Sequence, residues 1–245
     1  MILTKKNSSL CPTPWHLISF PRSGNHLVRG LLEGASGRKT LGCSGAKNDE
    51  PIYKRIENKR RKILDVDPFK PPVAMKSHFS TEIWRYSKKY PEAGVILITR
   101  DPVDAISSHL LRSIDSEKNL ALRDYSREIR QSLREYLHLL YVYRSYPEEM
   151  RYHIRFNDLM GSEENISLIV SQISKKMNAG FTRLTNEKIA EIRSLTKDTQ
   201  SSLTNPNPIV KGILRKAIQL RITNKEVDHF LAGAISTNSN ASLNC

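Results

Sequence analysis

The chain has 245 residues, with 39 Lys or Arg against 25 Asp or Glu, so its formal net charge is +14. A hydrophobic fraction of 38% and a charged fraction of 26% exclude a disordered chain, and the length allows a full core. The three cysteines lack metal-ligand spacing, which argues against a zinc module or a disulfide framework. No apolar run is long enough to cross a bilayer or to form a signal peptide, so we expect a cytoplasmic protein.

Short apolar runs and helical patterns alternate along the chain. We expect a tail over residues 1–14, one α/β domain over 15–235 and a polar tail over 236–245. Apolar runs predict buried strands at His16–Phe20, Val73–Ser77, Val95–Thr99 and Tyr152–Phe156. Helical spacing predicts helices at about 26–34, 81–90, 102–113, 122–144, 162–177, 186–197 and 224–235. The segment 36–71 is rich in Gly, Pro and basic residues, and predicts an irregular excursion with one short basic helix.

The alternation predicts a mostly parallel sheet with helices on both faces, and a P-loop-like strand, loop and helix at the N-terminus. Three of the predicted strands end in polar clusters: Pro21–His26, Lys76–His78 and Arg100–Asp101. The carboxyl ends of parallel strands meet at one edge of the sheet, where such folds bind ligands. We therefore expect the three clusters to form one site.

The first cluster, Pro-Arg-Ser-Gly-Asn-His, has the order expected of a phosphate-binding loop. Gly24 lets the backbone curl toward an anion, and the following helix adds partial positive charge at its N-terminus. Arg22 and Ser23 can donate hydrogen bonds to the anion. The loop is not a Walker A motif, because the Gly-Lys-Ser/Thr ending is absent. The alternative is an ordinary strand-to-helix turn with a capping Ser or Asn.

The other two clusters add two cations, Arg100 and Lys76, and a candidate general base, His78. Arg100 ends a strand, and Ser108 follows in the next helix, so an anion touching both would lie alongside that helix. The alternative for Arg100 is an ion pair with Asp104. Lys76 and His78 alternate along a strand and point to the same side, which suits charge stabilisation beside a general base. A structural histidine is the alternative for His78.

The surplus of positive charge favours anionic partners. The densest basic run, Tyr53–Lys62, holds six basic residues and one glutamate. It is either a solvated helix face or a docking patch for an acidic substrate or a membrane surface. No helix-turn-helix or RNA-binding aromatic signature accompanies it, so we do not expect a nucleic-acid partner.

Four segments, in order, resemble the sulfotransferases that use 3′-phosphoadenosine 5′-phosphosulfate (PAPS). FPRSGNHLVR resembles the family's 5′-phosphosulfate loop, and MKSHFS resembles its Lys-Thr-His segment. ILITRDPVDAISSH is similar to the 3′-phosphate motif, and RFNDL to the family's Tyr-Glu-Asp-Leu strand end. The resemblance covers residues 16–160 and implies the PAPS-dependent, P-loop-like sulfotransferase fold.

The resemblance also implies roles for individual residues. His78 is the implied catalytic base, and Lys76 and Arg22 are the implied stabilisers of charge. The implied donor-binding residues are Arg22, Ser23, Gly24, Asn25, His26, Arg100, Ser108, Phe156, Lys211 and Gly212. Arg22 stands where the family has lysine, and Leu27 where a tryptophan often stacks on adenine. The match at Lys211 and Gly212 is only a remnant of the family's C-terminal motif, and core packing is an alternative for Phe156.

The implied reaction is in-line transfer of a sulfuryl group from PAPS to an acceptor hydroxyl or amine, with no metal. The sequence leaves the acceptor open among small molecules, carbohydrates and lipids, and it leaves the oligomeric state open. A P-loop kinase is one alternative, which lacks support because no Lys-Ser/Thr pair or magnesium-binding aspartate is evident. A non-catalytic binder of anionic polymers is the other.

Overall fold

The computed structural model of the protein describes residues 13–42, 51–116, 122–201 and 208–222. Within these residues, parallel strands form a five-stranded sheet in the order β2-β3-β1-β4-β5. They are β1 (Trp15–Ser19), β2 (Thr40–Gly42), β3 (Ala74–Ser77), β4 (Val95–Thr99) and β5 (Arg151–Arg155). Because β1 is central, the segments that leave β3 and β4 flank the loop that leaves β1.

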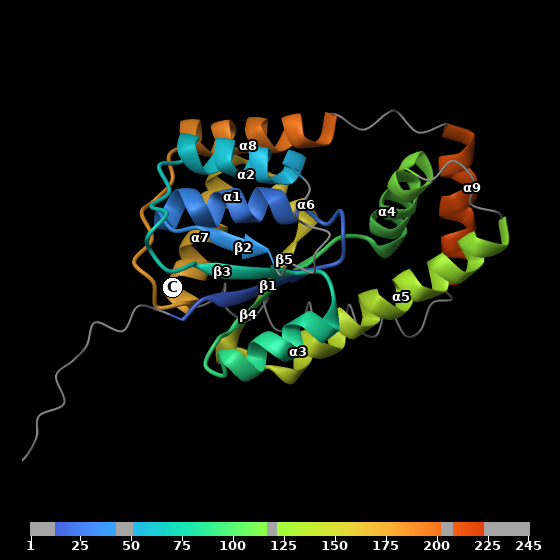
Figure 1. Cartoon of the computed structure of the whole chain (residues 1–245), viewed down its shortest axis with the longest axis horizontal. Coiled ribbons are helices and arrows are strands. Elements are labelled where there is room, and N and C mark those ends of the chain that lie inside the picture. Colours follow the sequence, from blue (N-terminus) through green and yellow to red (C-terminus); the bar gives the residue numbers. More distant parts are fainter. Residues whose placement is uncertain (1–12, 43–50, 117–121, 202–207, 223–245) are drawn as a thin grey trace, which may run out of the picture.

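Helices cover both faces of the sheet (Figure 1). On one side lie α1 (Asn25–Ser36), α2 (Pro51–Ile63), α6 (Phe156–Leu159), α7 (Glu163–Lys176) and α8 (Asn186–Ser201). On the other side lie α3 (Ser80–Lys89), α4 (Pro102–Ser116), α5 (Leu122–Ser145) and α9 (Pro208–Gln219). A short 3₁₀ turn, Glu148–Met150, precedes β5. The expected α/β class, a parallel sheet between two helical layers, is confirmed.

Two apolar clusters hold the layers together. Leu17 and Ile96 face the cluster under α1, α7 and α8, and Ile18 and Leu97 face the cluster under α3, α4, α5 and α9. These four side chains are at most 1% exposed. Each contributes about 1.5–3 kcal/mol through burial, which explains why β1 and β4 are apolar on both faces.

The predicted strands agree with the observed ones to within a residue or two, and β4 agrees at both ends. The sequence did not indicate β2, a three-residue edge strand within the segment expected to be irregular. The sequence ends the first helix at about residue 34, but α1 continues through Gly34 to Ser36. The absence of a side chain at Gly34 lets α8 pack closely, because an atom of Ile192 lies 3.1 Å from where a Cβ would stand. Gly37 ends the helix with φ 61°.

The basic run Tyr53–Lys62 lies in α2, and part of it faces inward. Arg60 is 4% exposed and donates to the fully buried Glu33 of α1, with Nε 2.7 Å from Oε2. Arg61 contacts Glu33 and Glu57, and Glu57 also pairs with the buried Arg29 of α1 at 2.5 Å. Neither sequence interpretation foresaw this network, which fastens α2 to α1. The predicted helix 224–235 lies outside the described residues.

Of the helices the structure describes, none has the length and apolarity that crossing a membrane would require.

Candidate active site

The loop between β1 and α1 forms a tight turn with an uncapped helix at its end. Arg22 and Gly24 both have positive φ, 69° and 89°. Gly24 is the N-cap of α1, and no side chain caps the helix there. The first bonds run from the amides of Leu27 and Val28 to the carbonyl oxygen of Gly24, so the preceding amides have no intrahelical acceptor. The alternative of a Ser- or Asn-capped turn is therefore wrong, and the helix end suits an anion.

Two buried polar atoms in this loop make no hydrogen bond with any described residue. They are Oγ of Ser23 and Nδ1 of His26. Burial and the charges of Arg29, Arg60, Lys76 and Arg22 lower the pKa of His26 to about 3, so its ring is neutral at neutral pH. A buried hydroxyl without a partner costs about 1–3 kcal/mol, which a bound anion would offset. Asn25 instead supports the loop, because its amide donates to Ser19 Oγ at 3.0 Å.

Side chains from three separate segments meet above this loop. Nε of Arg22 donates to Oγ of Ser108 in α4 at 3.3 Å. Arg100, which follows β4, donates from Nη1 to the carbonyl oxygen of Arg22 at 3.1 Å. Asp104, the alternative partner of Arg100, instead forms an ion pair with Arg215 of α9. The structure thus brings Arg22, Arg100 and Ser108 to one place, as the parallel topology requires.

Phe156, the first residue of α6 directly after β5, lies beside Arg100 and the loop. Its ring lies 4.8 Å from the guanidinium carbon of Arg100, in a cation–π contact. A Cβ on Gly24 would stand 2.9 Å from Cδ2 of this ring, so only glycine lets the loop and the ring come so close. Phe156 is half-buried and belongs to neither apolar cluster. Core packing, the alternative for this residue, does not describe it.

His78 leaves β3 on the other side of β1. Its Nδ1 lies 2.8 Å from the carbonyl oxygen of Ser19 and 3.4 Å from Ser19 Oγ. A carbonyl only accepts, so Nδ1 carries the proton and Nε2 keeps its lone pair. Burial and then the charge of Lys76 lower the pKa of His78 well below its usual range. The histidine is therefore neutral, with one nitrogen able to accept a proton.

The remaining predicted residues, Lys211 and Gly212, lie on α9 and are exposed. This helix packs against α4, which carries Ser108, and Arg215 joins the two helices through Asp104. No contact of Lys211 or Gly212 with the loop is recorded among the described residues. Their role in binding stays a prediction.

Two further side chains belong to the site but were not predicted. Tyr136 of α5 donates from its hydroxyl to the carbonyl oxygen of Arg100 at 2.7 Å. His109 packs edge-on against Phe20 at 5.5 Å, and burial and the charge of Arg22 lower its pKa. Tyr136 falls at an apolar position of the predicted helix 122–144, where nothing in the sequence separates a hydroxyl donor from a core residue. His109 directly follows Ser108 and could have been found from that position.

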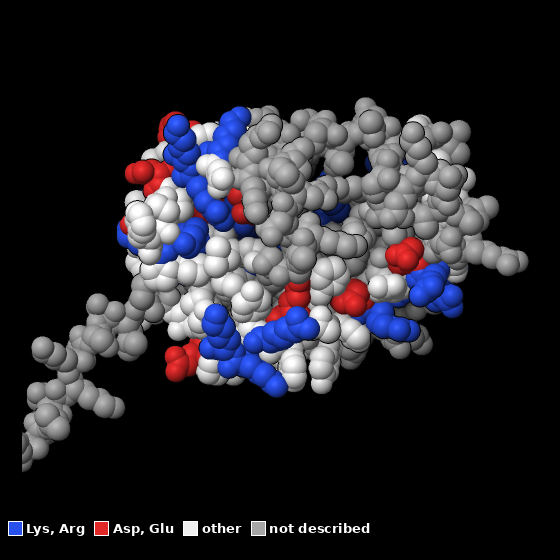
Figure 2. Space-filling view, viewed as in Figure 1, with Lys and Arg blue, Asp and Glu red and all other residues white. Residues whose placement is uncertain are grey.

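Basic side chains are prominent on the face of the molecule in Figure 2, where they gather over α3 and around α2. The exposed cations on α3 are Arg85, Lys88 and Lys89, and Lys88 lies 3.7 Å from the ring centroid of the exposed Trp84. Part of the positive surplus therefore lies outside the cluster around Arg22 and Arg100.

No family model matches the sequence, and no curated protein sequence matches it. Solved structures do match the fold. STF1, a sulfotransferase from Mycobacterium tuberculosis, is 10% identical with a TM-score of 0.53, over 86% of this chain and 76% of that one. A sulfotransferase from Alicyclobacillus acidocaldarius is 16% identical with a TM-score of 0.44, over 68% and 81%. Mouse SULT7A1, complexed with PAP, is 15% identical with a TM-score of 0.48, over 79% and 67%. The chain has the fold of the sulfotransferases.

Proposed function

We propose that this protein is a sulfotransferase that moves a sulfuryl group from PAPS to an acceptor hydroxyl or amine. The observation that carries the proposal is the contact of Arg100 with the carbonyl oxygen of Arg22, under the ring of Phe156. It joins the segments that resemble the family's 3′-phosphate and 5′-phosphosulfate motifs. The fold shared with STF1 adds support.

In this proposal the donor lies along the edge of the sheet. The loop from Arg22 to His26 would bind the 5′-phosphosulfate, using the free amides at the start of α1 and the unpaired hydroxyl of Ser23. Arg100 and Ser108 would bind the 3′-phosphate. Phe156, already beside Arg100, would contact the adenine, and Lys211 with Gly212 would add contacts from α9.

The reaction would be a direct displacement at sulfur. The acceptor oxygen or nitrogen forms a bond to sulfur, and the bond from sulfur to the bridging 5′-phosphate oxygen breaks. Nε2 of His78 takes the acceptor's proton, and the leaving group is adenosine 3′,5′-bisphosphate (PAP). Arg22 and Lys76 stabilise the charge that grows on the leaving oxygen, a role worth roughly 3–4 kcal/mol for one donor.

The test is a transfer assay with labelled PAPS across phenols, carbohydrates and lipids, with binding of PAP measured by calorimetry. His78→Ala should lower transfer by about 10²–10⁴-fold because the general base is lost. The same variant should bind PAP with nearly wild-type affinity. Exposed His138 offers a matched control, and His138→Ala should leave transfer unchanged. Unaltered turnover in His78→Ala would remove this residue from the mechanism.

A further inference from the structure

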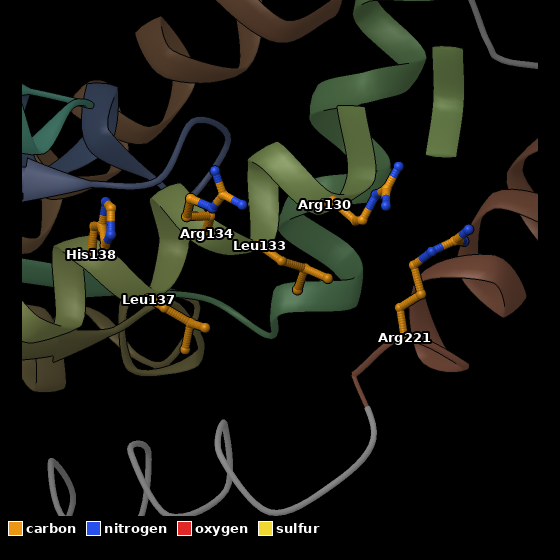
Figure 3. Close-up of a pocket in the computed structure, with 6 residues that line it drawn as sticks. All are labelled: Arg130, Leu133, Arg134, Leu137, His138 and Arg221. Atoms are coloured by element: carbon orange, nitrogen blue, oxygen red, sulfur yellow. The ribbon is translucent and has the colours of Figure 1, made fainter. Parts of the chain in front are cut away.

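A second candidate binding site lies on α5, where no predicted site residue falls. Here a hollow of about 510 Å³ opens between α5 and the end of α9 (Figure 3). Its size is within the range of small-molecule sites in proteins, roughly 300–1,000 Å³. We name it the α5–α9 pocket, and it is lined by Arg130, Leu133, Arg134, Leu137, His138 and Arg221.

The charge of this lining is one-sided. It holds three arginines and no carboxylate, and no ion pair of these arginines with a described residue is recorded. In Figure 3 the guanidinium groups of Arg130 and Arg134 extend to the same side of α5, and Arg221 lies across from Arg130 just beyond α9. Gathering like charges costs energy that a bound anion would offset.

Hydrogen bonds hold two of the arginines together. Nε of Arg130 donates to the carbonyl oxygen of Ser126 at 3.3 Å, and Nη2 of Arg221 donates to the hydroxyl of the same serine at 2.8 Å. Ser126 therefore fixes two cations, one on α5 and one just beyond the end of α9, within reach of one ligand. A planar guanidinium binds carboxylate or phosphate with two parallel bonds, so this pair suits an oxyanion.

The rest of the lining is apolar. Leu133 and Leu137 lie one turn apart on α5 and are only partly buried. Apolar surface beside three arginines fits a ligand that has both an anionic head and a hydrocarbon part.

We propose that the α5–α9 pocket binds a dissolved amphipathic anion, in which a carboxylate or phosphate is attached to a short hydrocarbon chain. The head contacts Arg130, Arg134 and Arg221, and the chain lies on Leu133 and Leu137. The site depends neither on the nucleotide nor on the transfer reaction, so it stands or falls separately from the proposed function.

Three probes separate the two parts of the ligand in calorimetry with the full chain. Octanoate carries charge and chain, 1-octanol has the chain alone, and acetate has the charge alone. Octanoate should bind saturably. Each partial probe should bind at least about tenfold more weakly, since 1-octanol lacks the charged hydrogen bonds and acetate lacks the buried methylenes. Equal affinity for octanoate and acetate would overturn the proposal, as would the absence of saturable octanoate binding.

Matched charge reversals locate the site. Arg130→Glu and Arg134→Glu should each weaken octanoate binding by about tenfold or more. Arg127→Glu makes the same change on an exposed residue of α5 outside the pocket, and should leave the affinity unchanged. Equal losses in all three variants would reduce the effect to general surface charge and contradict the proposal. Circular dichroism and the thermal midpoint confirm that each variant is folded.

Two further measurements separate this site from other sources of binding. Octanoate should bind Arg100→Ala with wild-type affinity, whereas a loss there would place octanoate in the proposed nucleotide site and overturn the inference. Vesicles of phosphatidylglycerol test the membrane alternative. Vesicle binding without any octanoate binding would assign the arginines to a membrane surface instead of a dissolved ligand.

Discussion

At the scale of single residues, the contact of His78 with Ser19 decides what the histidine can do. A backbone carbonyl fixes the proton on Nδ1, so the ring needs no rearrangement before Nε2 accepts a proton. Burial and the charge of Lys76 favour the neutral ring. The same lysine would stabilise the leaving group, so one charge serves both requirements of the proposed reaction.

The lowered pKa of His78 predicts an unusual pH dependence of transfer. An ordinary histidine with a pKa of about 6.5 would be only about one-tenth neutral at pH 5.5, and the rate would fall accordingly. We expect the rate to stay near its plateau there, because protonation of His78 occurs at lower pH. Lys76→Met removes a positive neighbour and should move the acidic inflection of the residual activity upward. A wild-type inflection near pH 6.5 would contradict this account.

Gly24 is the residue whose side-chain size matters most in the loop. Gly24→Ala places a methyl 2.9 Å from the ring of Phe156 and at φ +89°, where a non-glycine residue costs about 1–2 kcal/mol. We expect weaker PAP binding in this variant, measured by calorimetry. Phe156→Ala removes the ring's own contacts as well as the clash, so the double variant should lose less affinity for PAP than the sum of the two single losses. Full independence of the two substitutions would show that the loop and the ring are not in contact.

At the scale of elements, the charged residues between α1 and α2 hold the helix that carries the loop. Burial opposes ionisation of Glu33, but the charge and hydrogen bonds of Arg60, with Arg29 and Thr40, outweigh it and lower the pKa of the carboxyl. Thr40 Oγ1 donates to Glu33 Oε1 at 2.6 Å, which adds β2 to the network. The network thus positions the start of β2, the second turn of α1 onward and the end of α2.

Arg60→Ala should therefore destabilise the protein. Breaking a buried pair leaves an uncompensated carboxylate, which costs about 3–5 kcal/mol, and Arg61 at 3.7 Å replaces only part of the loss. Urea denaturation measures the change in the free energy of unfolding. The neighbouring Lys59 is exposed, and Lys59→Ala should change that free energy by less than about 0.5 kcal/mol. Similar values for both variants would mean that the buried network adds no stability.

The sequence predicts an element well when local residue patterns determine it, and poorly when tertiary contacts do. β4 is apolar and β-branched between clear boundaries, and the carboxylate of Asp101, before α4, accepts from the amide of Asp104, a capping contact that an Asp-Pro pair favours. β2 has only three residues and pairs with β3 alone, so its stability comes from tertiary contacts that no local pattern records. The inward side of α2 could not be predicted for the same reason. An arginine is expected on the surface, and only the tertiary contact with Glu33 buries Arg60.

At the scale of the whole molecule, the buried histidines predict a stability that depends on pH. Burial lowers the pKa of His16 and of His153 to about 4, so both are neutral in the fold and take up protons on unfolding. Their stabilising contribution is complete above pH 6.5 and is lost as the pH falls from there toward 4, by up to about 1.4 kcal/mol per pH unit for each. Urea denaturation at pH 7.0 and 5.5 should show the decrease, and His16→Phe should reduce it. Equal stability at both values would contradict the prediction.

Topology predicts that the segments after β1, β3 and β4 meet, but not the side-chain contacts among them or the place of Lys211 and Gly212. Parallel strands around β1 bring the segments after β1, β3 and β4 to one edge, and Arg22, His78 and Arg100 all lie there. The donation from Tyr136 to Arg100 and the arginine pocket on α5 depend on how helices pack, which no local pattern contains. The identity of the acceptor cannot be predicted from the sequence for the same reason.

The central claim is that one nucleotide bridges the loop at Gly24 and the guanidinium of Arg100. Calorimetry with Arg100→Ala tests it, comparing PAP with AMP, which lacks the 3′-phosphate. We predict that the variant binds PAP at least about tenfold more weakly than the wild type, since a hydrogen bond between charged groups is lost. Its affinity for AMP should change little, and the exposed control Arg85→Ala should bind both nucleotides normally. An equal loss for PAP and AMP, or none for either, would contradict the claim.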